Sequence, residues 1–348
     1  MFKNFKFNKI SNELEFEISD IDISILNGLR RILISDIPIL GFTIDDNLIN
    51  IEENTTSLNN EIISNRIALI PINISEKYNE EFDSINNSFE IILDVSCQNK
   101  LDLENITTNN LKIKVDGNIV KNNKDYFNYN LISNEPILIH RIKNNQTLKL
   151  NAKATKDIGR NNASFCIVSG IAVYNKINEK SKETDIIKKE RDIVENIYIF
   201  KFEIINNTIS HLYLFKKAIE ILIFKLDEIK LELSKNDSTL ISINNYFDYI
   251  NTFDINIKNE NDTIGYIIQS KIFDKYIVNK KKFKEYECEF VGYTKKHPLD
   301  NTLILRITLK KCDDKNIIKA FIIEECIDLI YLLNNIIKEW IYFNEINK

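Results

Sequence analysis

Residues 22–38 constrain the fold most strongly, because they combine an amphipathic helix with a defined start and stop. Ser24 is a candidate N-cap, and Pro38 prevents the helix from continuing. Between them, apolar residues recur at helical spacing: Ile25, Leu26, Leu29, Ile32 and Leu33. One face of this helix therefore needs a partner surface, and Arg30 and Arg31 are predicted to point away from that face.

The two arginines have two interpretations when taken alone. Such pairs on amphipathic helices are most often solvated surface, but planar guanidinium groups can also bind carboxylates of another chain. The wider pattern favours binding. Residues 27–33 (Asn-Gly-Leu-Arg-Arg-Ile-Leu) and 35–38 (Ser-Asp-Ile-Pro) resemble the first helix of the alpha-like assembly subunits of cellular RNA polymerases. That family comprises the bacterial alpha subunit, the archaeal D-type subunit and the third-largest subunit of eukaryotic polymerases.

The composition is that of a globular protein with two or three domains. The chain has 348 residues, of which 44% are hydrophobic and 28% charged. No apolar run reaches the roughly 18 to 20 residues that span a bilayer, and the N-terminus lacks the uncharged stretch of a secretion signal. The net charge of −5 argues against direct sequence-specific DNA binding, since a phosphate backbone attracts basic surfaces. We expect a soluble protein that is not secreted, does not bind a membrane and leaves nucleic acid to other chains.

Catalytic, cofactor-binding and metal-binding patterns are not found in the sequence. The five cysteines are scattered and never form C-x-x-C, which predicts reduced thiols in a cytosol-like compartment. His140, His211 and His297 are isolated from any cluster of carboxylates or cysteines. For His297, packing or a turn hydrogen bond is the favoured role. The sequence therefore predicts no catalytic residue, no cofactor and no metal.

Alternating apolar and polar residues predict strands on both sides of the first helix. One strand is expected within 5–18, and two more within 39–44 and 48–51. A short helix at 61–72 follows. Its basic residue, Arg66, and the apolar run before the proline resemble a second signature of the alpha-like family.

Residues 51–151 are predicted to form a mostly β insert. Strands are expected within it at 89–95, 111–115 and 137–141. Some alpha-like subunits bind zinc or an iron–sulfur cluster in this region through several cysteines. This insert contains only Cys97, so no such site is expected.

A positively charged loop follows at 153–165. Its charges and its tight bend come from Lys153, Lys156, Arg160 and Gly159. The segment resembles the family's Gly-Ile-Gly loop, although Asn162 and Phe165 replace the usual His and Trp. A phosphate-binding loop would need more glycines and a following helix, whereas residues 166–174 are typical of a strand. We therefore favour a protein partner over a nucleotide.

The following segments complete the first half of the chain. A charged run at 176–191 is expected to be an exposed loop, and a strand is expected at 197–205. Residues 208–234 predict a long helix that resembles the C-terminal helix of the dimerisation domain of the archaeal D-type protein. Its predicted inward face consists of Leu212, Phe215, Ile219, Leu222, Phe224, Leu226 and Ile229.

The second half carries a second set of signatures. A strand at 253–258 precedes residues 261–268, which open a helix with Asp262 or Thr263 as the cap. These residues resemble the Asp-His-Thr-Leu-Gly motif of the archaeal L-type subunit and of the eleventh subunit of polymerase II. Residues 290–300 resemble the Gly-Tyr and His-Pro-Leu loop of the same subunits. A strand at 303–309 and an amphipathic helix at 317–340 are expected to close the chain.

These resemblances imply an α+β protein that fuses two subunit types. A D-like dimerisation domain is expected at 1–50 and 152–235, and it carries the insert domain at 51–151. A linker at 236–250 would lead to an L-like dimerisation domain at 251–348. The resemblance implies a non-catalytic assembly scaffold for a DNA-directed RNA polymerase. Its expected partners are the two largest subunits, chiefly the second-largest, and small polymerase subunits.

The resemblance also assigns residues to two surfaces. The expected partner-facing residues are Asn27, Arg30, Arg31, Arg66, Lys153, Lys156, Gly159 and Arg160. The residues expected to pair the D-like and L-like parts within the chain are Leu29, Leu33, Phe215, Leu222, Thr263, Gly265, Ile267 and Phe321.

Fused chains of this kind are a feature of polymerases encoded by large cytoplasmic DNA viruses. The resemblance therefore implies a viral protein that acts in the cytoplasm of an infected cell, in viral factories, and it leaves open whether the chain is also packaged in virions. The alternative is an alpha-like binding module that acts outside the polymerase as a regulator. Motifs on both halves argue against that alternative, because sequestering one host subunit would need only one surface.

Overall fold

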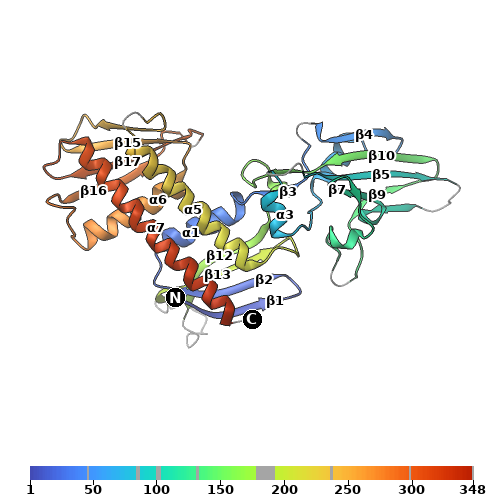
Figure 1. Cartoon of the computed structure of the whole chain (residues 1–348), viewed down its shortest axis with the longest axis horizontal. Coiled ribbons are helices and arrows are strands. Elements are labelled where there is room, and N and C mark those ends of the chain that lie inside the picture. Colours follow the sequence, from blue (N-terminus) through green and yellow to red (C-terminus); the bar gives the residue numbers. More distant parts are fainter. Residues whose placement is uncertain are drawn as a thin grey trace, which may run out of the picture.

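The computed structural model describes residues 1–44, 47–83, 87–98, 103–130, 133–177, 193–235, 238–297 and 299–346. Their main β-sheets lie in three regions, which Figure 1 shows as a V. We call them the N-terminal sheet at the base, the middle sheet at the right and the C-terminal sheet at the upper left. All of the sheet pairings are antiparallel.

The N-terminal sheet has the strand order β1-β2-β13-β12. Its strands are β1 (Phe2–Asn8), β2 (Glu13–Ser19), β12 (Val168–Ile177) and β13 (Ile193–Ile204). The prediction of one strand within 5–18 is wrong, because a hairpin divides this segment. Asn12 adopts a φ of 50°, and the Asn8 side chain accepts a hydrogen bond from the backbone of Ile10 at the turn. Of the charged run expected as a loop at 176–191, residues from 178 onward lie outside the described residues.

Two helices cover the inner face of the N-terminal sheet. They are α1 (Ile23–Ser35) and α5 (His211–Ser234). Asp22 caps α1 by accepting a hydrogen bond from the Ser24 backbone at 2.7 Å, so the prediction of Ser24 as the cap is wrong. The predicted inward position of Phe224 is also wrong, since its side chain is 62% exposed. Residue 224 lies about 200° around the helix from Leu222, which is buried.

The middle sheet has the order β4-β10-β5-β7-β8 and its own hydrophobic core. Its strands are β4 (Ile49–Asn54), β5 (Phe89–Cys97), β7 (Lys112–Val115), β8 (Asn118–Ile119) and β10 (Gln146–Lys153). Asp116 and Gly117 join β7 to β8 with positive φ angles of 51° and 79°, which suit a two-residue hairpin turn. The surrounding elements are α2 (Asn60–Ala68), α3 (Glu76–Glu81), β6 (Glu104–Thr107) and β9 (Leu138–Ile142).

A short ribbon joins the middle and N-terminal regions. It consists of β3 (Ile39–Gly41) paired with β11 (Thr155–Asp157). Strand β3 directly follows α1, and β11 begins the basic loop predicted at 153–165. The ribbon therefore places that loop beside the end of α1.

The C-terminal sheet has the order β14-β15-β17-β16. Its strands are β14 (Ile241–Asn245), β15 (Thr252–Lys258), β16 (Cys288–Thr294) and β17 (Thr302–Leu309). Helix α6 (Asp262–Ile272) is capped by the Asn261 side chain rather than by Asp262 or Thr263. Strand β14 lies within the range expected as a linker, of which residues 236–237 lie outside the described residues.

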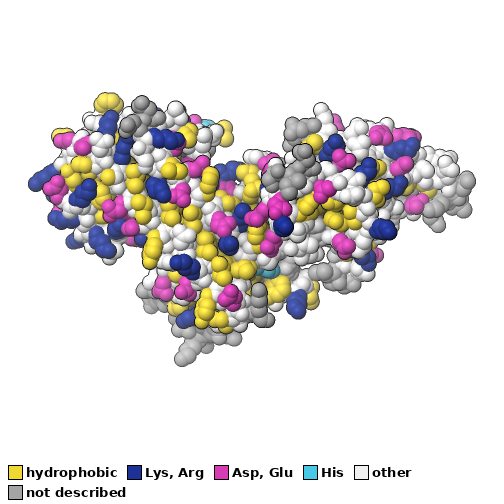
Figure 2. Space-filling model, in the orientation of Figure 1, with side chains coloured by type: hydrophobic (Ala, Val, Ile, Leu, Met, Phe, Trp, Pro, Cys, Tyr) yellow, Lys and Arg dark blue, Asp and Glu magenta, His cyan; other side chains and the backbone are white. Residues whose placement is uncertain are grey.

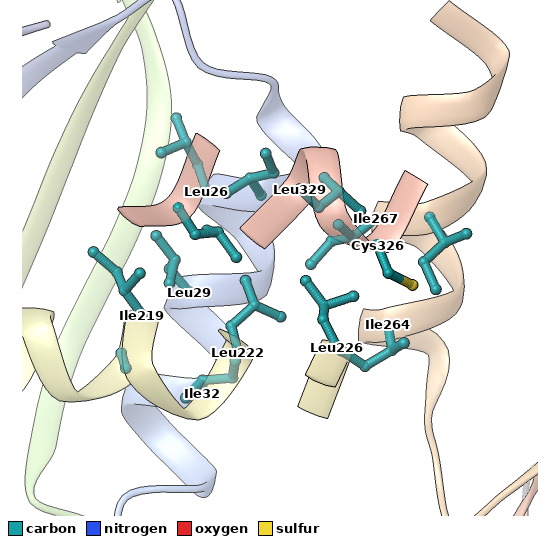
Figure 3. Close-up of a cluster of buried hydrophobic side chains, with 14 of the residues drawn as sticks. Leu26, Leu29, Ile32, Ile219, Leu222, Leu226, Ile264, Ile267, Cys326 and Leu329 are labelled. Atoms are coloured by element: carbon teal, nitrogen blue, oxygen red, sulfur yellow. The ribbon is translucent and has the colours of Figure 1, made fainter. Parts of the chain in front are cut away.

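Helix α7 (Lys315–Ile346) connects the C-terminal sheet to the N-terminal sheet. It runs antiparallel to α5, because Lys319 contacts the carbonyl of Lys235 and Trp340 contacts the carbonyl of Leu212. Helix α1 packs against both α5 and α6. The buried side chains of both sheets and all four helices form one continuous hydrophobic core, part of which is drawn in Figure 3.

Candidate partner interface

Helices α1 and α6 cross closely at Gly28. A Cβ atom at this position would lie 2.7 Å from Cδ1 of Ile267 and 3.3 Å from Cγ2 of Thr263. A glycine inside a helix costs about 1 kcal/mol relative to alanine. Here the glycine allows two helices from distant parts of the sequence to approach each other, which brings the polar ends of both to one surface.

Asn27, Arg30 and Arg31 lie together on the solvent side of α1. The Nε atom of Arg30 donates to Oδ1 of Asn27 at 2.9 Å, which fixes the direction of the guanidinium group. Arg31 is exposed. With Asp262, Tyr266 and Tyr293, among others, Asn27 and Arg31 line a cavity of about 330 Å³ between α1 and α6. This surface offers a pre-oriented cation and hydrogen-bonding groups to a partner.

The electrostatics of this cavity depend on both helices. Burial is the main cause that raises the pKa of Tyr293, and the carboxylate of Asp262 adds to it. Arg31 acts in the opposite direction on the pKa of Tyr293. The cavity is therefore neither a purely basic nor a purely acidic site.

The basic loop docks onto the C-terminal end of α1. The backbone N–H of Arg160 donates to the carbonyl of Ser35 at 2.8 Å. The guanidinium group of Arg160 binds both carboxylate oxygens of Asp36, at 2.6 and 2.8 Å. A Cβ atom at Gly159 would lie 2.7 Å from the carbonyl oxygen of Ile34 and 2.7 Å from Sγ of Cys166. The loop and the helix thus form one rigid surface.

Gly159→Ala is expected to weaken this docking by about 1–3 kcal/mol, because the new methyl group would overlap a backbone carbonyl that cannot move aside. Thermal unfolding and amide hydrogen exchange at residues 158–161 measure the effect. Gly117→Ala is the control: no atom lies within 4 Å of that position, so only its positive φ is penalised and the loop at 158–161 is unaffected. Unchanged exchange at residues 158–161 in Gly159→Ala would contradict the prediction.

The remaining basic residues expected at the partner surface bind groups of the same chain. Lys153 pairs with Glu90 at 3.4 Å, and Lys156 pairs with Asp83 at 3.2 Å. The Arg66 guanidinium group donates to the carbonyls of Ile139 and Leu138, at 2.5 and 3.0 Å. The structure therefore gathers Asn27, Arg30, Arg31, Gly159 and Arg160 at α1, whereas Arg66, Lys153 and Lys156 are held by the middle region.

Most of the residues expected to pair the two parts lie in the shared core. Leu29, Leu33, Phe215 and Leu222 are fully buried, and Ile267 is 1% exposed. Figure 3 draws Leu29 and Leu222 in the same cluster of buried side chains as Ile267 and Ile264 of α6. Hydrophobic burial of this kind contributes roughly 1.5–3 kcal/mol per side chain.

Two of the expected pairing residues make close contacts within the C-terminal region. A Cβ atom at Gly265 would meet Leu303 and Tyr293. The ring of Phe321 lies 4.9 Å from that of Tyr276 and 5.1 Å from that of Phe283. Gly265 thus allows α6 to approach its own sheet, and Phe321 packs α7 against the segment after α6, which includes the π-helix Phe273–Val278.

Trp340 was not predicted as a pairing residue. It is fully buried, and its ring contacts those of Phe2, Phe16 and Phe215 at 4.6–5.2 Å. Its indole N–H donates to the carbonyl of Leu212 at 3.2 Å. The last helix of the chain therefore packs into the N-terminal sheet. The signal in the sequence was that this single tryptophan continues the apolar spacing of its helix.

Lys225 of α5 and Glu260, just before α6, form a buried ion pair at 3.3 Å. Their side chains are only 18% and 9% exposed. Burial raises the pKa of Glu260, whereas Lys225 and, more weakly, the charge of Arg160 act to lower it. Sequence spacing gave no signal for this pair, because 35 positions separate its members.

Each of the three histidines is either buried or in polar contact with the backbone of the same chain. Nδ1 of His297 accepts a hydrogen bond from the backbone of Leu299 at 3.2 Å, which confirms the turn role. The ring of His211 contacts the carbonyl of Asn12, and His140 is buried. The described residues contain no cluster of three or more potential metal ligands. Among these residues, no helix is long and apolar enough to cross a membrane.

Comparisons with known proteins find a family match over residues 15–226. The family described as RNA polymerase Rpb3/Rpb11 dimerisation domain matches residues 15–226, which is more than half of the chain. The match includes α1, the basic loop and most of α5.

Individual relatives agree with this match. Subunit 3 of DNA-directed RNA polymerases II, IV and V from Arabidopsis thaliana is 26% identical over 217 residues, which cover 56% of this chain and 65% of that protein. The polymerase II subunit rpb3 of Dictyostelium discoideum is 27% identical over 177 residues (47% and 54%). Human RPAC1 of polymerases I and III is 25% identical over 187 residues (48% and 53%). The chain spans less than two thirds of each relative's length. By the match over residues 15–226, the chain belongs to the RNA polymerase Rpb3/Rpb11 dimerisation domain family.

Proposed function

We propose that this chain is a non-catalytic assembly subunit of a multisubunit DNA-directed RNA polymerase. In this proposal, residues 1–235 act as the D-like member of a dimer and carry an insert at 51–151, and residues 251–348 act as the L-like member. The shared core of α1, α5, α6 and α7 is the observation that carries the proposal. Together with the family match, it supports a chain that contains both members of a dimer.

A covalent link has a physical advantage for such a platform. Two separate subunits must meet before the surface between α1 and α6 exists, and their pairing depends on their concentrations. In a single chain the pairing step is intramolecular, so the cavity lined by Arg31 and Tyr266 forms at any protein concentration. We propose that this surface, with the docked Arg160 loop, binds the second-largest polymerase subunit.

Purification of the tagged chain from its native source tests the proposal. We expect two very large polypeptides with the polymerase catalytic aspartate motif to co-purify, together with small polymerase subunits. Recovery of the chain with a single unrelated protein would instead favour the alternative, an alpha-like regulator that acts outside the polymerase.

Reversing the charges at Arg30 and Arg31 to glutamate is expected to reduce recovery of the second-largest subunit by at least about tenfold, since like charges would face its carboxylates. The unfolding temperature should change little. Arg31 is exposed, and the hydrogen bond from Arg30 to Asn27 lies within α1, so its loss does not separate α1 from another element. The matched control is Lys112→Glu with Lys114→Glu, an equal change of charge on β7. Undiminished recovery in the Arg30/Arg31 variant would remove α1 from the proposed interface.

We also propose a viral origin and a cytoplasmic site of action. The support comes from the composition: the chain has only 7 glycines, 4 prolines, 1 methionine and 1 tryptophan, a bias that fits an A+T-rich genome. Imaging of the tagged chain in infected cells is expected to show cytoplasmic factories. An exclusively nuclear signal would contradict this part of the proposal.

A further inference from the structure

The C-terminal sheet has one protected edge and one open edge. Strand β16 forms one edge, and its pairing with β17 is interrupted by a bulge between Cys288 and Phe290. Charged side chains flank it, since Glu287 and Glu289 both approach Lys310. Bulges and charges are the usual means by which proteins prevent an edge strand from pairing with another chain.

Strand β14, the opposite edge, has no bulge and no charge within the strand, although charged side chains from the ends of α5 and α7 lie beside it. Its sequence, Ile-Ser-Ile-Asn-Asn, contains no charged residue and no proline, and its register with β15 is regular throughout. Other sheet edges differ: β1 and β12 pair with register shifts, β4 carries two glutamates, and β8 has only two residues. Among the described edges of the larger sheets, β14 is the one best suited to accept another strand.

The register of β14 with β15 shows which backbone groups of β14 are available to hydrogen-bond with an added strand. The N–H of Tyr246 donates to the carbonyl of Thr252, and the N–H of Lys258 donates to the carbonyl of Leu240. Hydrogen-bonded pairs alternate along an antiparallel ladder, so Ser242 and Asn244 also face β15. The N–H and C=O groups of Ile243 and Asn245 therefore point away from the sheet.

Space for an added strand lies beside this edge. A cavity of about 620 Å³ is lined by Ile241, Ile243 and Asn245 of β14 and by residues at the ends of α5 and α7. Its other walls include apolar Leu233 and both acidic and basic side chains. A segment with alternating apolar and polar side chains would suit these walls.

The turn after β14 presents apolar side chains in a fixed arrangement. Phe247 is fully exposed, Ile250 is 85% exposed and Tyr249 is 70% exposed. The ring of Tyr246 stacks on that of Tyr249 and on the Arg306 guanidinium group, whose carbon lies 3.5 Å from the centroid of the Tyr246 ring. These contacts hold the turn in place before any partner binds, which lowers the entropic cost of binding.

Arg306 is itself fixed, because it binds both carboxylate oxygens of Asp254 at 2.6 and 2.8 Å. The hydroxyl of Tyr246 interacts with Asp248, the charged residue of the turn. The turn at 246–251 therefore offers no free cation, and a negative charge disfavours both nucleic acid and anionic lipid surfaces. A polypeptide remains as the occupant that fits.

We propose that β14 binds an extended segment of another polypeptide as a fifth strand of the C-terminal sheet, with Phe247 and Ile250 as apolar anchors. The main-chain groups of Ile243 and Asn245 supply the hydrogen bonds, and the cavity receives alternate side chains. This surface is distinct from the one at α1. Residue 252 pairs with 308 and residue 258 with 302, so the turn at 246–251 and the start of α6 lie at opposite ends of β15.

Asn245→Pro tests the strand addition selectively. Proline removes the outward N–H without removing a hydrogen bond to β15, and it is tolerated at an edge position. Asn245→Ala is the matched control, because it loses the same side chain but keeps the N–H. In the complex purified with the tagged wild-type chain, we expect the amides of residues 243 and 245 to exchange at least about tenfold more slowly than in the free chain. We expect one polypeptide to be lost from the Asn245→Pro complex and retained with Asn245→Ala.

A photo-crosslinking amino acid at Phe247 identifies the occupant, which should map to an extended segment of the polypeptide that Asn245→Pro loses. Equal exchange of these amides in the free and assembled chain would overturn the inference, even where the large polymerase subunits co-purify. If the large polymerase subunits did not co-purify with the wild-type chain, that result would instead count against the proposed function. The inference about β14 would also be overturned if the isolated chain formed a dimer that Asn245→Pro dissociates, because the edge would then serve self-association.

Discussion

Trp340→Ala is expected to lower the free energy of unfolding by about 3–5 kcal/mol, the usual cost of removing a large aromatic side chain from a core. The substitution removes the ring contacts with Phe2, Phe16 and Phe215, and it leaves the carbonyl of Leu212 without its indole donor. Denaturant unfolding followed by circular dichroism measures the change. Because the core is continuous, we expect the helices and the N-terminal and C-terminal sheets to lose structure in one transition.

The control for this prediction is Tyr331→Ala on the same helix. Tyr331 is 70% exposed, so its removal should change the free energy of unfolding by less than about 0.5 kcal/mol. Figure 2 shows the hydrophobic side chains that gather over α5 and α7 on this face of the molecule. If Trp340→Ala were as mild as Tyr331→Ala, the packing of α7 against the N-terminal sheet could not be an important source of stability.

Lys225→Met is expected to destabilise the chain by about 3 kcal/mol at neutral pH, because it leaves Glu260 buried without its cation. The double variant Lys225→Met, Glu260→Gln should recover most of this loss. Removing one member of a buried ion pair costs more than replacing both members with uncharged groups. A double-mutant cycle in denaturant unfolding, with Glu260→Gln as the second single variant, measures the coupling.

The pH dependence of this effect has a definite sign. Burial already raises the pKa of Glu260 in the folded chain, and loss of Lys225 would raise it further. Folding then opposes ionisation of the Glu260 carboxyl group. The loss of stability is therefore present at pH values at which Glu260 is ionised in the unfolded chain. It should fade as the pH falls towards the ordinary glutamate pKa of 4.5, since the group is then protonated in both states. A penalty in Lys225→Met that did not change with pH would exclude Glu260 as its cause.

Local periodicity predicted the main helices well. The prediction for α1 followed from apolar spacing and a terminal proline, and α5 and α7 followed from long amphipathic patterns. Their caps were harder to predict, because Asp22 and Ser24 are both competent residue types and only the backbone geometry selects Asp22. The hairpin of β1 and β2 was missed since its alternation of apolar and polar residues gives no sign of the reversal at Asn12.

The candidate interface was predictable only where it lies on one element. Arg30 and Arg31 could be placed together because they are adjacent on the polar side of one helix. By contrast, Arg66 and Lys156 were expected at the same surface, and their internal partners depend on contacts between distant segments. Three other features also depend on contacts between distant segments: the approach of Gly28 to α6, the pair of Lys225 with Glu260, and the packing of Trp340 against Phe2. Such contacts cannot be inferred from spacing along one segment.

The contact between Phe2 and Trp340 has a consequence for synthesis of the protein. At about 5–20 residues per second, a ribosome needs roughly 17 to 70 s to reach residue 340 after residue 2. Throughout that interval the aromatic face of β1 and β2 lacks the helix that covers it in the finished fold. The nascent chain must therefore remain soluble with Phe2 and Phe16 uncovered by α7, which makes the growing polypeptide a natural client for chaperones that bind exposed aromatic segments.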